Sequence, residues 1–242
     1  DQHADTFRAR LELWSTARGR VISSRTIETP VSQPFAFLDR LYFDTADMLG
    51  LTPQNGDAAS ECGVRGAGTL RFLLQGIGRV RSATTLEEAS GAVEDLELAR
   101  RAEPETGATL AWLAAAQRRC YSLGSDPSWL DKAEISAREA VARDSSRAEA
   151  YRNLGLVLLV RKDTPGAVVA FARACSLNPT DDETCSRLGS AYGRLGDPER
   201  EMATYDAVVA SRPHCWQPYW WIANAHYRSG HVPASIRAFR EM

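Results

Sequence analysis

The chain has 242 residues, of which 44% are hydrophobic, 25% are charged and 11 are proline. This composition is typical of a folded globular domain and excludes both intrinsic disorder and a fibrous repeat. The formal net charge of −2 disfavours nucleic acid as a partner, because contacts to phosphates need clustered lysine and arginine. No run of about 18 consecutive apolar residues occurs, so no membrane span is predicted, and residues 1–7 lack the basic and apolar regions of a signal peptide.

Residues 7–29 predict a β-hairpin, which Pro30 ends. Apolar residues alternate with charged ones from Phe7 to Leu13, which is the period-two pattern of a half-buried strand. Residues 17–20 supply a turn, and the β-branched run over 21–29 predicts the second strand.

A helix follows, with Pro34 at its start and Gly50 at its end. One face of this helix is apolar and consists of Phe35, Leu38, Leu41 and Leu49. The polar, glycine-containing stretch over 52–65 predicts a linker. Two strands and one helix bury little area by themselves, so we expect residues 1–51 to be the tail of a truncated α/β domain from a longer protein.

Beyond the linker the sequence repeats with a period of 34 residues. A unit that begins at Ala148 places apolar, small and proline residues at Tyr151, Leu154, Gly155, Leu158, Ala167, Phe171, Ala174 and Pro179. Thirty-four residues later, matching types recur at Leu188, Gly189, Tyr192, Tyr205 and Pro213, and after a further period at Tyr219, Ile222, Ala223, Gly230 and Phe239. Such a repeat indicates two-helix units that stack side by side.

Two earlier units fit the same pattern less closely. The step from residue 107 to residue 148 is 41 residues, seven more than the period, and we predict a long connection over 121–128. The fold class predicted for residues 66–242 is therefore mainly α, a right-handed α-solenoid of about five helical hairpins. The array ends at Met242 without a polar capping helix, which also indicates a truncated parent.

The unit has two positions, 8 and 20, where the helices of a hairpin approach closely and only small residues fit. Glu201 stands at position 20 of the fourth unit. With no partner foreseen for this carboxylate, Glu201→Ala is expected to be neutral or stabilising, by about 1 kcal/mol.

Residues 66–242 resemble tetratricopeptide (TPR) repeats. The resemblance is closest to the repeat regions that follow the kinase domain in bacterial membrane-linked serine/threonine protein kinases, and to those of adenylate-cyclase-type regulators. Its specific segments are residues 126–133 (DPSWLDKA) and 212–216 (RPHCW), and residues 7–51 look like the end of the small α/β domain before such repeats. The resemblance implies a signalling scaffold or sensor, in the bacterial cytoplasm or on the extracytoplasmic side of a membrane-anchored parent.

No catalytic motif supports an enzymatic reading of this chain. The glycine-rich loop, the V-A-I-K lysine, H-R-D and D-F-G are all missing from the sequence, so any kinase activity would belong to the parent protein. Gly76 and Gly78 lack the rest of a nucleotide-binding loop, and we interpret them as helix-packing residues. No cofactor is predicted. A helical part of a larger enzyme and an RNA-binding helical repeat remain the alternatives.

The five cysteines, Cys62, Cys120, Cys175, Cys185 and Cys215, are odd in number and show no C-x-x-C spacing. We therefore expect neither a disulfide framework nor a thiolate metal site, but small buried side chains. His226 and His231 lie near Cys215 without a metal-binding spacing, so a structural or surface role is expected for them.

In the TPR fold, first-helix positions 2, 5, 9, 12 and 13 line a concave groove that takes a protein or peptide. The corresponding residues are Arg152, Leu156, Leu159, Ser190, Arg194, Trp220, Asn224, Tyr227 and Arg228. The arginines at 194 and 228 would hold a carboxylate or carbonyl of the peptide, Asn224 would pair with its backbone, and the two aromatic residues would pack on its apolar side chains. A groove that is merely solvated, or covered by another segment of the parent, remains open.

Two further features bear on this groove. A clamp for two carboxylates, as in repeats that hold chaperone tails, is not expected, because only Asn224 matches its Lys and Asn pattern. Trp216, Trp220 and Trp221 cannot all point inward from one helix, so at least one should be exposed or covered by a partner.

Overall fold

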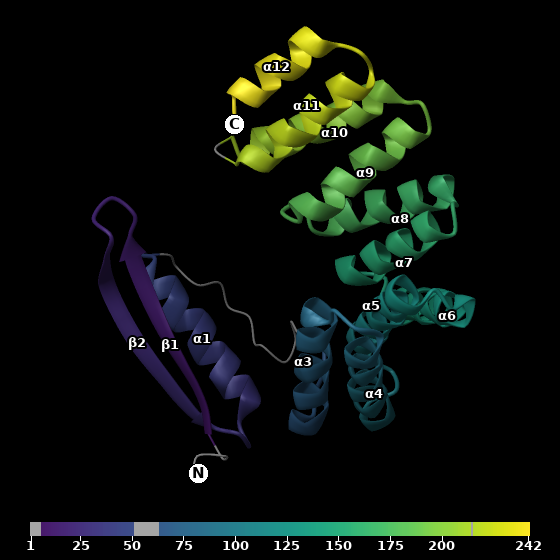
Figure 1. The fold of residues 1–242 in the computed structure, drawn as a ribbon. Coiled ribbons are helices and arrows are strands. Elements are labelled where there is room, and N and C mark those ends of the chain that lie inside the picture. Colours follow the sequence, from purple (N-terminus) through teal and green to yellow (C-terminus); the bar gives the residue numbers. More distant parts are fainter. Residues whose placement is uncertain (1–5, 51–62, 214) are drawn as a thin grey trace.

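The computed structural model describes residues 6–50, 63–213 and 215–242. Strands β1 (Thr6–Ser15) and β2 (Arg20–Pro30) are followed by helix α1 (Pro34–Met48). The other described helices are α3 (Ala67–Ser82), α4 (Leu86–Ala102), α5 (Gly107–Gly124), α6 (Pro127–Arg143), α7 (Ala148–Val160), α8 (Thr164–Leu177), α9 (Asp182–Arg194), α10 (Pro198–Ser211), α11 (Trp216–Arg228) and α12 (Val232–Arg240). Helices α3 to α12 form five consecutive helical hairpins (Figure 1). The predicted solenoid is therefore confirmed, as are the predicted β-hairpin and the helix that follows it.

The two strands pair antiparallel, and their inner face rests on α1. Ile27 is fully buried, and the Phe7 ring contacts Phe37 of α1 with 5.3 Å between centroids. Leu49, which was predicted on the apolar face of this helix, instead follows its last turn and is 54% exposed. Gly50 ends the helix as predicted, with a φ of +67° that favours glycine. The predicted linker over 52–65 lies mostly outside the described residues.

The second helices of the second, third and fourth hairpins, α6, α8 and α10, begin at aspartate caps. Asp126, Asp163 and Asp197 each accept a hydrogen bond from a backbone N–H of the first turn, at 2.9, 2.9 and 3.0 Å. Each is followed by a proline at the first or second helical position, where the missing N–H costs nothing. Local sequence therefore determines where these helices start.

The second hairpin corrects one prediction. Only Ser125 and Asp126 separate α5 from α6, so the predicted long connection over 121–128 does not exist. The seven extra residues lengthen the helices instead, because α5 has 18 residues where α7 has 13, and α6 has 17 where α8 has 14. Residues 126–133 form the start of α6 rather than a turn.

Within each hairpin, small residues let the helices approach closely. A Cβ at Gly155 would overlap the Phe171 ring, and one at Gly76 would lie 2.5 Å from Leu96, so both glycines face a large buried side chain. Gly78 has no neighbour within 4 Å of such a Cβ. The predicted helix-packing role is therefore confirmed for Gly76 and is wrong for Gly78.

The cysteines correct a second prediction. Cys175 of α8 and Cys185 of α9 form a disulfide, with 5.6 Å between their Cα atoms. This bond joins the third hairpin to the fourth. Cys120 is buried and unpaired, and Cys215 is partly buried, as expected for small packing residues; Cys62 lies outside the described residues.

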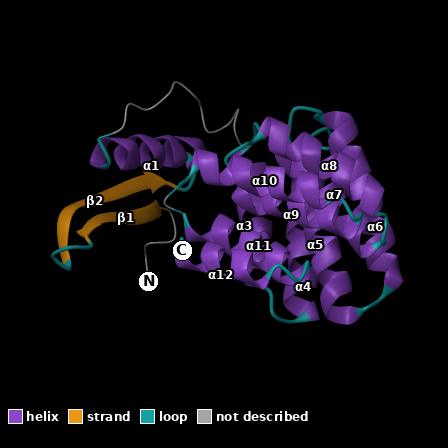
Figure 2. Ribbon diagram, turned by 90° about the horizontal axis from the view of Figure 1, so that it is seen from above, coloured by secondary structure: helices purple, strands orange, loops and turns teal. Residues whose placement is uncertain are grey.

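The array curves from α3 to α12, and the β-hairpin unit lies on its open side (Figures 1 and 2). Phe35 and Leu38 of α1 pack against the buried cluster of the first hairpin, which includes Leu70 and Leu96. Across the parts of the chain that are described, no helix combines the length and the apolar character that a membrane crossing needs.

Candidate binding groove

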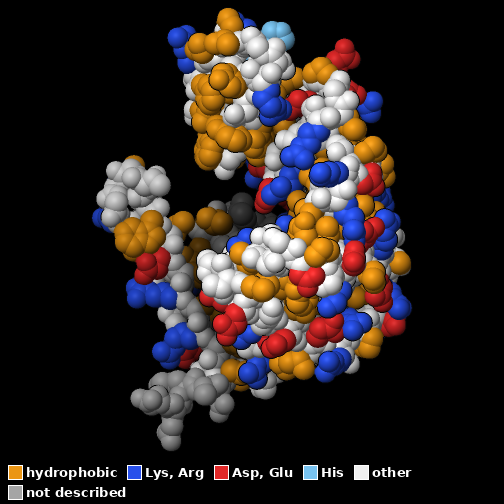
Figure 3. All heavy atoms as spheres, turned by 45° about the vertical axis from the view of Figure 1, so that its right-hand side comes forward, with side chains coloured by type: hydrophobic (Ala, Val, Ile, Leu, Met, Phe, Trp, Pro, Cys, Tyr) orange, Lys and Arg blue, Asp and Glu red, His pale blue; other side chains and the backbone are white. Residues whose placement is uncertain are grey.

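The inside of the curve is lined by the first helices of the hairpins. α3 contacts α5, α5 contacts α7, and α9 contacts α11. The space-filling view shows a hollow between the β-hairpin and the C-terminal helices, with hydrophobic side chains gathered on those helices at the top (Figure 3).

Several aromatic residues of α11 are exposed. Trp220 is 45% exposed and Tyr227 is 67% exposed, although both are large and apolar. Trp216 is also exposed, whereas Trp221 is partly buried with its ring centroid 6.0 Å from that of Tyr205. The prediction that the three tryptophans cannot all point inward is therefore confirmed, with two of them in solvent.

The polar residues predicted around these rings differ in whether they already form hydrogen bonds within the protein. Arg194 is exposed and forms no hydrogen bond or ion pair with any residue in the described ranges. Ser190 is partly buried and its hydroxyl lies 3.0 Å from that of Tyr205. Asn224 donates from Nδ2 to the carbonyl of Trp220 at 2.7 Å, so part of its hydrogen-bonding capacity is used inside its own helix.

Arg228 already has a partner within the protein. Its guanidinium forms an ion pair with Glu201, which is 5% exposed, and the Tyr205 hydroxyl donates to the same carboxylate at 3.2 Å. Gly193 leaves the space that this carboxylate fills, since a Cβ there would overlap it. The expectation that Glu201→Ala would be neutral or stabilising assumed a carboxylate without partners, and it is corrected by this pair.

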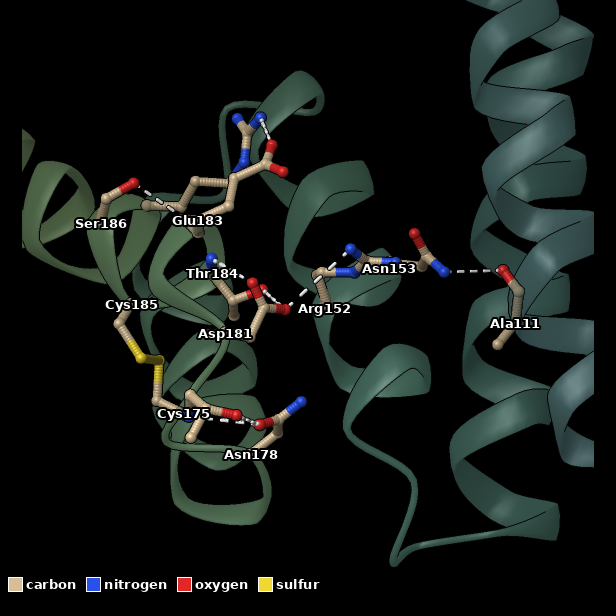
Figure 4. Close-up of polar contacts among 12 residues, drawn as sticks. Ala111, Arg152, Asn153, Cys175, Asn178, Asp181, Glu183, Thr184, Cys185 and Ser186 are labelled. Carbon is tan, nitrogen blue, oxygen red and sulfur yellow. Dashed lines mark hydrogen bonds and ion pairs between the residues drawn. A yellow bond between two sulfur atoms is a disulfide. The ribbon is translucent and has the colours of Figure 1, made fainter. Parts of the chain in front are cut away.

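The residues predicted in the third hairpin divide between core and groove. Leu156 and Leu159 are partly buried and pack on the cluster around Phe171, so they contribute to the core as well as to the surface. Arg152 points from α7 toward Asp181, with 4.0 Å between charged atoms (Figure 4). Its neighbour Asn153 is buried and donates to the carbonyl of Ala111 at 2.8 Å, which holds α7 on α5.

Sequence reasoning missed the groove residues of the first two hairpins. Two arginines contact the Trp112 ring of α5, with Arg81 at 5.5 Å and Arg152 at 5.8 Å from its centroid. Arg118 of α5 is partly buried, and its Nε has no hydrogen-bond partner in the described structure. A unit counted from residue 107 places Arg118 at position 12, but the 41-residue step obscured this assignment.

The histidines of the last hairpin contact each other, with 6.2 Å between their ring centroids. Cys215 instead directs its thiol to the side-chain oxygen of Gln217, at 3.0 Å. In the residues that the structure describes, no three His, Cys, Asp or Glu side chains gather where they would hold a metal ion.

Comparison with known proteins agrees with this architecture. The tetratricopeptide repeat family matches residues 130–182 and 186–242. No curated protein sequence matches the chain.

Solved structures with the same fold include a MamA crystal structure, which is 23% identical, covers 64% of this chain and 86% of its own, and has a TM-score of 0.52. A tetratricopeptide repeat protein from Parabacteroides merdae is 20% identical, covers 72% of this chain and 65% of its own, and has a TM-score of 0.56. The Pseudomonas aeruginosa protein pilF is 17% identical over 72% of this chain and 74% of its own, with a TM-score of 0.59. Residues 130–182 and 186–242 therefore match the tetratricopeptide repeat family, within a helical array that shares the fold of these structures.

Proposed function

We propose that the array is a non-catalytic scaffold that binds an extended segment of another protein along its concave face. The observation that carries this proposal is that Arg194 of α9 and Trp220 and Tyr227 of α11 are all exposed, on two first helices that contact each other. Large aromatic and arginine side chains are the residues that contribute most to protein interfaces. A curved stack of helical hairpins presents such side chains over a long continuous surface.

The test uses a library of random 12-residue peptides displayed on phage, selected on the immobilised chain. Selected peptides are expected to bind the wild-type chain and to lose binding to a variant with Arg194→Ala and Trp220→Ala. The matched control replaces two exposed side chains of second helices, Arg101→Ala and Ile135→Ala, and should bind normally. Circular dichroism of each variant checks that its helix content is unchanged. Selected peptides that bind the groove variant as well as the control would refute the proposal.

A narrower proposal concerns the protein to which the chain belongs. The resemblance of residues 126–133 and 212–216 to repeats that follow kinase domains supports a role as the regulatory region of a bacterial serine/threonine protein kinase or a related signalling protein. The coding sequence upstream of Asp1 tests this directly. A kinase domain followed by one membrane span is expected there, and an unrelated domain would contradict the proposal.

A further inference from the structure

We propose that the groove recognises an acidic segment, whose carboxylates are held by a basic site on the inner helices α3, α5, α7 and α9. This basic site consists of Arg81, Trp112, Arg118, Arg152 and Arg187. The inference rests on the proposed peptide-binding function and specifies the chemistry of the peptide.

The site is assembled around the Trp112 ring. The guanidinium groups of Arg81 and Arg152 lie 5.5 and 5.8 Å from its centroid, close enough for a cation–π contact. These arginines come from helices that are far apart in sequence, yet the stacking of the hairpins directs both to one ring. The contact with the ring orders the two guanidinium groups but leaves their N–H donors available to an anion.

Among the described residues, Arg118 has no hydrogen-bond or ion-pair partner. The pKa of Arg118 is lowered by its burial and then by the positive charges of Arg187, Arg119 and Arg152, while the negative charge of Glu183 acts in the opposite direction. Its Nε is buried without a partner, and so is that of Arg152. A guanidinium that is desolvated, unpaired and surrounded by like charges destabilises the folded chain until an anion binds to it.

The acidic residues nearby are already engaged. Glu183 forms a 2.6 Å ion pair with Arg187 on the same helix. Asp181 caps α9, where it accepts hydrogen bonds from the N–H and hydroxyl of Thr184 at 3.1 and 2.6 Å (Figure 4). It therefore has little capacity left for Arg152, 4.0 Å away. Arg119 is also engaged, because its guanidinium donates to the carbonyl of Ala83 at the end of α3.

The occupant that fits this site is a carboxylate-bearing peptide. The planar guanidinium fork matches a carboxylate with two parallel hydrogen bonds. A nucleic acid would need an uninterrupted basic surface along its backbone, but apolar side chains lie among the arginines, at Leu156 and Leu159 in the third hairpin and at Trp220 in the fifth. Arginines in the first four hairpins and exposed aromatic surface in the fifth match an acidic segment that also carries apolar side chains.

The experiment compares paired synthetic peptides, labelled with fluorescein and measured by anisotropy. One peptide is chosen from the random library by its binding to the chain, and its partner carries Gln and Asn in place of every Glu and Asp. The Kd of the acidic peptide is expected to be at least about tenfold lower than that of its neutral partner. This is the difference that charged hydrogen bonds typically give. Arg118→Met should remove this preference, whereas Arg101→Met, which deletes an equal charge from an exposed position on α4, should keep it.

The stability of the free variants gives a second readout. Arg118→Met is expected to raise the melting temperature of the free chain, because it removes an unpaired desolvated charge, while Arg101→Met should leave it unchanged. A variant that merely damaged the fold would lower it. The inference is overturned if peptides that depend on Trp220 bind equally well in acidic and neutral form, or if a 12-nucleotide single-stranded RNA binds more tightly than the acidic peptide. A library from which no peptide binds at Trp220 would overturn the proposed function itself.

Discussion

At the scale of single residues, Glu201 shows how one side chain can break the repeat pattern and still fit. Position 20 is alanine or serine in the third and fifth hairpins, as Ala167 and Ser235, and both are buried. Glu201 occupies the same place because Gly193 makes room for its carboxylate and because Arg228 and Tyr205 bind it. The ion pair between Glu201 and Arg228 links α10 of the fourth hairpin to α11 of the fifth.

This arrangement makes a prediction about the pair Gly193 and Glu201. Gly193→Ala is expected to destabilise the wild-type chain by about 1–3 kcal/mol, because the new methyl group meets a carboxylate that is held in place. In a Glu201→Ala background the same change should stabilise by up to about 1 kcal/mol, the usual gain from alanine in a helix. Urea unfolding of the four variants measures the coupling. Equal effects of Gly193→Ala in both backgrounds would show that the two residues do not compete for space.

Glu201→Ala alone is expected to lower the free energy of unfolding by about 1 kcal/mol, since it removes a carboxylate to which two side chains donate hydrogen bonds. Its sign is opposite to the expectation from the sequence. The reason is physical: Arg228 lies 27 residues away from Glu201, and no local pattern predicts that their side chains meet. Arg228 was also predicted to bind a peptide in the groove, but its charge is already partly neutralised by Glu201.

At the scale of helices, most of the fold could be predicted from the sequence. Aspartate caps, prolines and the 34-residue period determine where the helices begin and how they pair. The spacing alone did not determine whether extra residues lengthen a loop or a helix, so the second hairpin was misassigned. Arg118 was missed for the same reason, as it lies in that hairpin. Trp112 stands at position 6 of its unit, which is not among the positions expected in the groove. The disulfide was missed because an odd cysteine count says nothing about which positions of successive units adjoin.

The disulfide makes a prediction at this scale. It closes a short loop between α8 and α9, with a sequence separation of 10 residues, and the chain-entropy account gives about 2–3 kcal/mol for such a loop. A reducing agent should therefore lower the melting temperature of the wild-type chain and leave a variant with Cys175→Ala and Cys185→Ala unaffected. Cys215→Ala should respond like the wild type. Wild-type chains that melt identically with and without reductant would contradict the prediction.

At the scale of the whole molecule, burial is unevenly distributed along the array. Helix α5 contributes eleven buried residues, whereas α12 contributes Ser235 and Ala238. In a stack where each hairpin contacts only its neighbours, local opening follows the local loss of buried surface. Native-state hydrogen exchange should therefore find the slowest amides in α5 and the fastest helical amides in α12. Uniform protection across the five hairpins would indicate a single cooperative unit instead.

The long second hairpin has a consequence for how a guest chain is aligned. A helix of 18 residues spans about 27 Å and one of 13 about 20 Å, so α5 is longer than α7 by more than one helical turn. On a uniform solenoid, a guest that slides by one unit meets the same surface again. Here the second and third hairpins differ in length, so a shift by one unit does not bring the guest to an identical surface. The seven extra residues therefore make the possible placements of a guest along the array distinguishable.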